Sequence, residues 1–88
     1  MIVAFRRSFV KDTKALNDPK IRKRLEQVIL EVESATHLGE VSGVLAMTGF
    51  PNAFRIRLGN YRIGIVRNGV AVEFVRFLDR KDIYKYFP

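Results

Sequence analysis

Residues 54–63 read Phe54-Arg55-Ile56-Arg57-Leu58-Gly59-Asn60-Tyr61-Arg62-Ile63. In this stretch, large apolar residues alternate with arginines on both sides of Gly59-Asn60. Alternation with a period of two is typical of a half-buried strand, and Gly-Asn suits a two-residue turn because both residues tolerate a positive φ. The stretch therefore predicts a β-hairpin with one apolar face and one face that carries arginines.

Counting outward from this turn gives the expected register. Arg57 lies opposite Arg62, and Arg55 lies opposite Gly64. Like charges directly opposite each other destabilise a sheet, so the first pair breaks a local rule in the way expected of a functional site. The other face must pack beneath helices, and its members are Phe54, Ile56, Leu58, Tyr61, Ile63 and Ile65.

The residues after the hairpin predict one further strand. Asn68-Gly69 is a strong signal for a two-residue turn, and residues 70–77 alternate as a strand would. The same counting places Arg62 opposite Val75 and Gly64 opposite Glu73. Gly64 would then leave a shallow floor beside the arginines. Glu73 would face them, either as their salt-bridge partner or in a catalytic role.

The residues before the hairpin predict a short strand and two helices. Residues 2–5 form an apolar run, and Ser8 can cap a first helix. Asp18 fits the N-cap of a second helix, Pro19 fits its first position, and apolar residues recur at helical spacing over 21–32. The chain is thus expected to be one α+β domain, residues 1–88, with an N-terminal strand and two helices packed on an antiparallel sheet and a short helical tail.

Composition excludes several kinds of site. The 88 residues include no cysteine and one histidine, so disulfides, thiolate sites and multi-histidine metal sites are excluded. We expect no metal and no cofactor. His37 follows the second predicted helix, far from the arginines, and fits a helix end. No apolar run is long enough to span a membrane, and residues 1–7 lack the charge-then-apolar order of a signal peptide, so a cytoplasmic protein is expected.

The charge distribution indicates an anionic partner. The net charge is +7 and the pI is about 10.3. Residues 50–88 hold eight basic and three acidic side chains, and no carboxylate lies between Val41 and Val72. Such a block attracts phosphate or an acidic protein, with binding that weakens as salt is added. The alternative is a solvated basic face that serves solubility.

Two segments resemble the RelE/ParE toxin superfamily. Gly49 together with residues 54–63 resembles the core motif of that family. Residues 77–84, Phe77-Leu78-Asp79-Arg80-Lys81-Asp82-Ile83-Tyr84, are similar to its C-terminal ending. The chain length and the predicted order of elements also fit. The resemblance implies a toxin of a type II toxin–antitoxin system, and RelE-like members of the family cut mRNA in the ribosomal A site.

The resemblance also implies roles for individual residues. Arg62 matches the arginine at the scissile phosphate, and Arg80 matches the C-terminal arginine that assists it. Tyr84 matches the tyrosine of the ending motif and is the third catalytic candidate. Arg55 and Arg57 match a basic pair that contacts the RNA backbone.

Some assignments stay open within this family pattern. In some RelE-like members the catalytic tyrosine lies two residues further on, which would select Tyr86; we count Tyr86 and Lys81 among the RNA contacts. Asp79 stands where relatives often have histidine, which weakens the positive field. Attack by a ribose 2′-hydroxyl needs a base, and arginine stays protonated. Tyr84, Tyr86, Glu73 or ribosomal RNA are the candidates.

The implied partners are mRNA on the ribosome and an antitoxin whose acidic segment covers the arginines, with a toxin–antitoxin hetero-oligomer as the possible assembly. No membrane partner is expected. Two alternatives remain at this level. One is a ParE-like inhibitor of DNA gyrase, and the other is a degenerate toxin that only binds its antitoxin.

Overall fold

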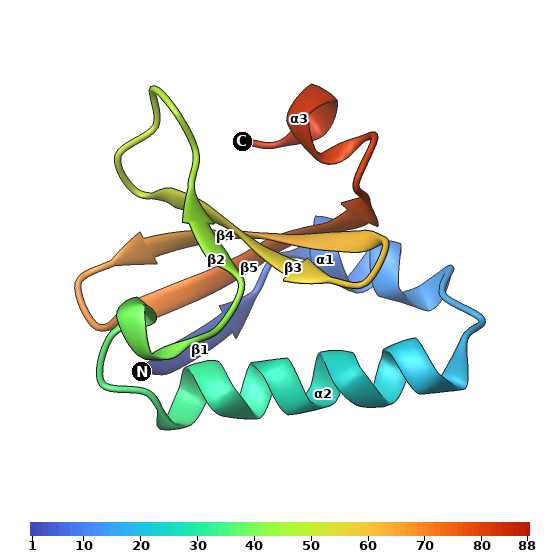
Figure 1. The fold of residues 1–88 in the computed structure, drawn as a ribbon, viewed down its shortest axis with the longest axis horizontal. Coiled ribbons are helices and arrows are strands. Elements are labelled where there is room, and N and C mark those ends of the chain that lie inside the picture. The colour runs from blue at the N-terminus through green and yellow to red at the C-terminus, as the bar shows by residue number, and fades with distance from the viewer.

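The computed structural model describes all residues, 1–88, and places five strands in one sheet between two layers of helix. The elements are β1 (Ile2–Phe5), α1 (Arg7–Lys14), α2 (Pro19–Ser34), the 3₁₀ turn η1 (Leu38–Glu40), β2 (Val44–Ala46), β3 (Ala53–Leu58), β4 (Tyr61–Asn68), β5 (Ala71–Asp79) and α3 (Ile83–Tyr86). The α2 helix lies along one side of the sheet, and α3 and the C-terminus lie on the other (Figure 1). The expected α+β fold is confirmed.

The sheet has the order β1-β5-β4-β3-β2 and is mixed. Strands β3 to β5 pair antiparallel, as expected, and β2 adds an antiparallel neighbour to β3, but β1 runs parallel to β5 at one edge. Strand β2 was not predicted, because its three residues are too few to show an alternating pattern. No helix combines the length and the apolar character needed to cross a bilayer.

The β3–β4 hairpin matches its predicted register. Arg57 pairs with Arg62 and Arg55 with Gly64, and Gly59 takes the positive φ of 58° that the turn requires. The apolar face packs under the helices, where Ile56 and Ile63 are fully buried. The arginines therefore occupy the opposite face, as the alternation indicated.

The β4–β5 pairing differs from the prediction. Asn68 pairs with Ala71, so the turn residues are Gly69 and Val70 rather than Asn68 and Gly69. Gly69 does adopt a positive φ of 61°, but it holds the first turn position instead of the second. The pairing between β4 and β5 is therefore shifted by two residues near the turn, and a shift of two leaves each side chain on its predicted face of the sheet.

A β-bulge at Val75 shifts the pairing by one more residue. Ile65 pairs with Phe74, whereas the preceding residue, Gly64, pairs with Arg76. The extra residue lets both Phe74 and Phe77 face the helices, where each packs against Phe9. Beyond the bulge, Arg62 lies opposite Leu78 and not Val75, and Gly64 does not lie opposite Glu73.

The two helices begin differently. In α2, the Asp18 carboxylate accepts from the N–H groups of Lys20 (3.0 Å) and Ile21 (3.3 Å), and Pro19 is the first helical residue, as predicted. In α1, the N-cap position is Arg6, so the prediction for Ser8 was wrong. The Ser8 hydroxyl instead donates to the carbonyl of Val75, the bulge residue, and links α1 to β5.

A second, smaller core lies on the face that carries the arginines. It consists of Met47, Ala53, Val75, Ile83 and Phe87. Phe87 packs against Gly64 so closely that a Cβ on Gly64 would lie 2.7 Å from the ring. The shallow floor predicted at Gly64 is therefore filled by the chain's own C-terminal tail, and it offers no open approach to the backbone.

Candidate functional site

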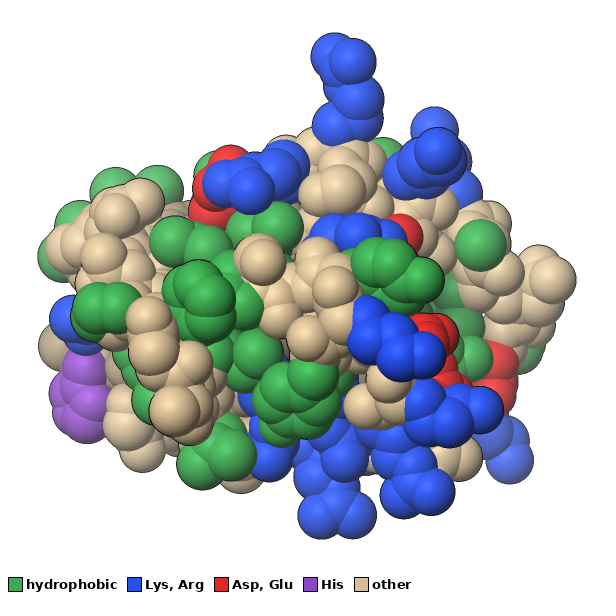
Figure 2. Space-filling model, turned by 90° about the horizontal axis from the view of Figure 1, so that it is seen from above, with side chains coloured by type: hydrophobic (Ala, Val, Ile, Leu, Met, Phe, Trp, Pro, Cys, Tyr) green, Lys and Arg blue, Asp and Glu red, His purple; other side chains and the backbone are tan.

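Four arginines gather on the face opposite α2, and we call them the arginine surface: Arg55, Arg57, Arg62 and Arg80. Three come from the β3–β4 hairpin, and the fourth follows β5. The Arg80 N–H donates to the carbonyl of Asn60 at 2.9 Å, so the end of β5 is held at the hairpin turn. Seen from the α3 side, Lys and Arg side chains crowd one margin of the molecule (Figure 2).

The arginine surface has no acidic counterpart. The three ion pairs of the chain join Arg6 to Glu73, His37 to Glu40 and Arg76 to Asp12. Glu73 was expected to face the arginines and does not. It pairs with Val66 in the ladder, four residues or about 13 Å along β4 from Arg62, and its carboxylate contacts Arg6. All four guanidinium charges therefore remain available to a ligand.

Arg62 lies at the centre of the arginine surface. Its Nη1 donates to the carbonyls of Gly59 (2.9 Å) and Tyr61 (2.8 Å), which fixes the guanidinium over the turn. Partial burial, followed by the positive charges of Arg55 and Arg57, lowers the pKa of Arg62 below its usual value. The group stays protonated. Its Nε and Nη2 have no protein acceptor and can form a forked contact with phosphate.

Tyr84 lies at the edge of the arginine surface. Its hydroxyl accepts a hydrogen bond from Nε of Arg55 at 3.3 Å, while Nη1 of Arg55 donates to the carbonyl of Gly43 at 3.3 Å. The side chain is 63% exposed. Its position depends on α3, which Ile83 and Phe87 anchor in the small core.

Tyr86 lies next to Arg76, away from the arginine surface. Its ring centroid is 6.0 Å from Cζ of Arg76, and Arg76 is held by Asp12 of α1 through bonds of 2.7 and 3.1 Å. The two tyrosines of α3 therefore contact different arginines. By position, Tyr84 belongs with Arg55 and Arg62, and Tyr86 does not.

The remaining candidates lie around these groups. The Asp79 carboxylate accepts the N–H of Lys81 at 2.9 Å and closes the turn after β5, with no ion pair to an arginine. Lys81 is exposed. Nδ1 of His37 accepts the N–H of Gly39 at 3.1 Å and caps η1, in keeping with the helix-end prediction.

Sequence reasoning missed two residues that position the site. The carbonyl of Gly43 receives the N–H of Arg57 (3.0 Å) as well as the guanidinium of Arg55, and Phe87 anchors the tail that carries Tyr84. The Ser42-Gly43 dipeptide, which marks a turn, was the available signal for the first, and Gly43 takes a φ of 79° there. Nothing local signalled the contact of Phe87 with Gly64.

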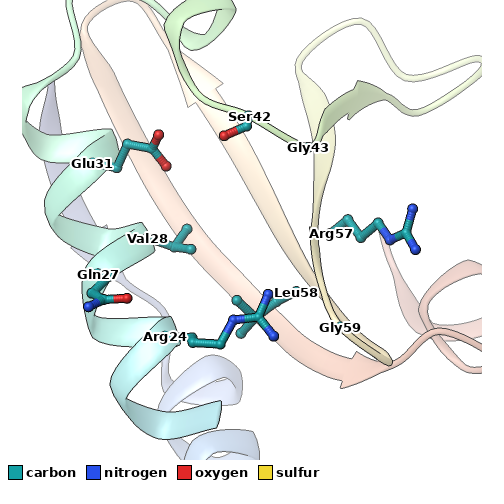
Figure 3. A pocket seen from close by; sticks show the side chains of 9 residues that line it. All are labelled: Arg24, Gln27, Val28, Glu31, Ser42, Gly43, Arg57, Leu58 and Gly59. Atoms are coloured by element: carbon teal, nitrogen blue, oxygen red, sulfur yellow. The ribbon is translucent and has the colours of Figure 1, made fainter. Parts of the chain in front are cut away.

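The largest groove lies away from these groups. It has a volume of about 550 Å³ between α2 and β3. Arg24 points across it toward Leu58 and Gly59, whereas the guanidinium of Arg57 points away from it (Figure 3). No cluster of three or more His, Cys, Asp or Glu side chains could ligate a metal. The arginine surface is thus an open face, which suits an extended polyanion better than a small molecule.

Comparison with known proteins identifies close relatives. No family model matches the chain. The chain is 44% identical to "Toxin RelE3" of Methanocaldococcus jannaschii over 89 residues, with both proteins covered completely. It matches a RelB–RelE antitoxin–toxin complex from Methanococcus jannaschii with a TM-score of 0.81 and 43% identity, covering 96% of this chain and 98% of that one. An intact RelBE complex of E. coli, 18% identical, shares the fold with a TM-score of 0.71 over 89% of this chain and 94% of the other.

Proposed function

The chain belongs to the RelE toxin family, and from this premise we propose that it is the toxin of a toxin–antitoxin pair that cleaves mRNA on the ribosome. One observation carries the proposal: four arginines without carboxylate partners surround a turn, and a tyrosine hydroxyl accepts a hydrogen bond from one of them. A surface of this kind binds phosphates and leaves a proton-carrying group beside them. A ribosomal target would place its action in the cytoplasm.

In the proposed reaction, the ribose 2′-hydroxyl attacks the neighbouring phosphorus and the bond from phosphorus to the 5′-oxygen breaks. The products are a 2′,3′-cyclic phosphate and a 5′-hydroxyl. Arg62 holds the scissile phosphate through Nε and Nη2 and stabilises the charge that builds up on it, and Arg80 assists. Removing one such donor typically costs about 10²–10³ in rate.

The proton must leave the 2′-hydroxyl and another must reach the departing oxygen. A guanidinium cannot act as the base at neutral pH. The Tyr84 hydroxyl accepts a hydrogen bond from Arg55 at the edge of the arginine surface, so we assign proton transfer to Tyr84. Glu73 is engaged with Arg6, and Tyr86 with Arg76, which disfavours both. Arg55 and Arg57 hold flanking phosphates, and Lys81 and Tyr86 add contacts further along the RNA.

The partner in the absence of RNA is an antitoxin whose acidic segment covers the arginine surface. The excess of positive charge in residues 50–88 and the RelB–RelE relatives support this assignment. Complementary charge accelerates association and makes it sensitive to salt. Antitoxin affinity should fall as salt rises, and an affinity independent of salt would contradict capture by these arginines.

Mapping RNA ends after expression of the chain tests the proposed reaction, with a DNA gyrase supercoiling assay run beside it. New ends at codons of translated messages, absent when translation is blocked, are expected. Inhibited supercoiling without new ends would select the gyrase alternative. Growth without arrest, together with tight antitoxin binding, would select a degenerate toxin.

A further inference from the structure

A second feature adjoins the arginine surface, a groove between β2, the 47–52 loop and α3 that we call the tail groove. Its lining includes Leu45, Met47, Phe50, Tyr84 and Phe87. Met47 and Phe87 form a buried floor, whereas Leu45 and Phe50 are 52% and 50% exposed. No charged side chain lines the groove, although 28% of the chain is charged. Half-exposed apolar walls of this kind point to a ligand.

The tail groove and the arginine surface share a border. Leu45 pairs directly with Arg55 in the β2–β3 ladder, so their side chains leave the sheet next to each other on the same face. Tyr84 lines the groove and its hydroxyl accepts from the guanidinium of the same arginine. In the view from the α3 side, apolar side chains lie beside the crowded cationic margin (Figure 2). One ligand can therefore contact both features.

A nucleotide has the matching chemistry, a flat apolar base joined through its sugar to an anionic phosphate. The groove has a volume of about 300 Å³, at the low end of the range for small-ligand sites, which suits one base. Three of its lining residues, Phe50, Tyr84 and Phe87, are aromatic, and bases stack on aromatic rings in single-strand binding proteins. Thr48 and Tyr84 are its two polar side chains, and the Tyr84 hydroxyl already contacts Arg55, so the groove offers little hydrogen bonding to distinguish bases.

We propose that the tail groove is a nucleobase subsite, with Phe50 as its stacking wall, that takes the base of a nucleotide whose phosphate lies on Arg55. This inference rests on the proposed function, since it assumes an RNA on the arginine surface. It assigns the 47–52 loop a task that the cleavage chemistry does not require. Because stacking tolerates any base, the subsite adds affinity and positions the strand without selecting a sequence.

The test compares two hexanucleotides with the same 2′-O-methyl ribose-phosphate backbone, which cannot be cut because it lacks the 2′-hydroxyl. One carries adenine at each position and the other carries no bases. The readout is the ratio of their dissociation constants for the full chain. The wild-type protein should bind the base-containing strand roughly tenfold more tightly.

In Phe50→Ala and, separately, in Leu45→Ala, this ratio should approach 1 while binding of the abasic strand stays unchanged. Val70→Ala is the matched control, because Val70 is an exposed apolar residue at the far hairpin and should keep the wild-type ratio. Arg55→Ala should weaken both strands together.

An unchanged ratio in Phe50→Ala overturns the subsite, whether both strands keep their affinity or lose it equally. A Phe50→Ala variant that loses antitoxin binding but keeps the ratio identifies a protein side chain as the occupant instead. A wild-type ratio near 1 also overturns it. None of these results bears on cleavage, which RNA-end mapping decides separately, so a failure of the subsite can be told apart from a failure of the proposed function.

Discussion

Arg62 and Arg76 lie two positions apart along the β4–β5 ladder, but their surroundings are opposite. Arg76 is bound by both oxygens of Asp12, and this hydrogen bonding raises the pKa of Arg76 above its usual value. Arg62 has three arginines and no carboxylate around it, and burial with those charges lowers the pKa of Arg62. One guanidinium is paired where α1 meets the sheet, and the other is held unpaired on the open face.

The difference separates a structural arginine from one kept for a ligand. The Asp12 carboxylate also accepts the N–H of Phe77 at 3.0 Å, so the pair fastens α1 to β5 just past the bulge. The Arg62 guanidinium is fastened by backbone carbonyls alone, which orient it without neutralising it. Substitution of the paired arginine should therefore affect folding, and substitution of the unpaired one should affect activity.

The largest loss of stability is expected from the helix-covered face of the hairpin. Ile56 is fully buried, so Ile56→Ala should reduce the free energy of unfolding by about 2–5 kcal/mol. Its neighbour Arg57 faces the open side, and Arg57→Ala should change stability by no more than about 0.5 kcal/mol. Urea unfolding of both variants measures this. Similar losses in the two would contradict the division of faces.

Arg76→Ala should cause the next largest loss in the free energy of unfolding. It removes two charge-assisted hydrogen bonds and leaves Asp12 partly buried without its partner, at a cost of about 1.5–3 kcal/mol. RNA cleavage by the folded fraction should persist, because Arg76 lies outside the arginine surface. Parallel measurements of thermal unfolding and specific activity check this. A stable but inactive Arg76→Ala would place Arg76 among the functional arginines.

Gly64→Ala tests the link between the small core and the arginine surface, which share one face of the sheet. The new Cβ would meet the Phe87 ring, so the tail must shift at a cost of about 1–3 kcal/mol, and Tyr84 should lose its contact with Arg55. Phe87→Ala should also destabilise the chain. The double variant should lose less than the sum of the two single losses, because the smaller residue makes room for the methyl group. Additive losses in a double-mutant cycle would show that the close contact does not limit the tail.

The predictions from sequence succeeded where neighbouring residues determine the structure. Gly59-Asn60 specified the hairpin register, and Asp18-Pro19 specified the start of α2. The predictions failed where residues distant in the sequence determine the local structure. The bulge at Val75 depends on packing of Phe74 and Phe77 against α1, so counting from Asn68-Gly69 could not find it.

The same distinction applies to the residues of the candidate site. Alternation alone placed Arg55, Arg57 and Arg62 on one face. Resemblance to a family supplied Arg80 and Tyr84. The wrong position predicted for Glu73 follows from the shifted β4–β5 register, and its pairing with Arg6 joins residues 67 apart in the chain. No local sequence pattern predicts a contact over such a distance in the chain.

Arg62→Ala gives the most direct test of the division between the two arginines. Cleavage by ribosomes programmed with mRNA should fall about 10²–10³-fold, while the free energy of unfolding stays within about 0.5 kcal/mol of wild type. Arg62→Lys should recover little, because an ammonium cannot reproduce the forked contact with phosphate. Full cleavage by Arg62→Ala would contradict the assignment of Arg62 to the scissile phosphate, and so would a loss of activity that merely parallels unfolding.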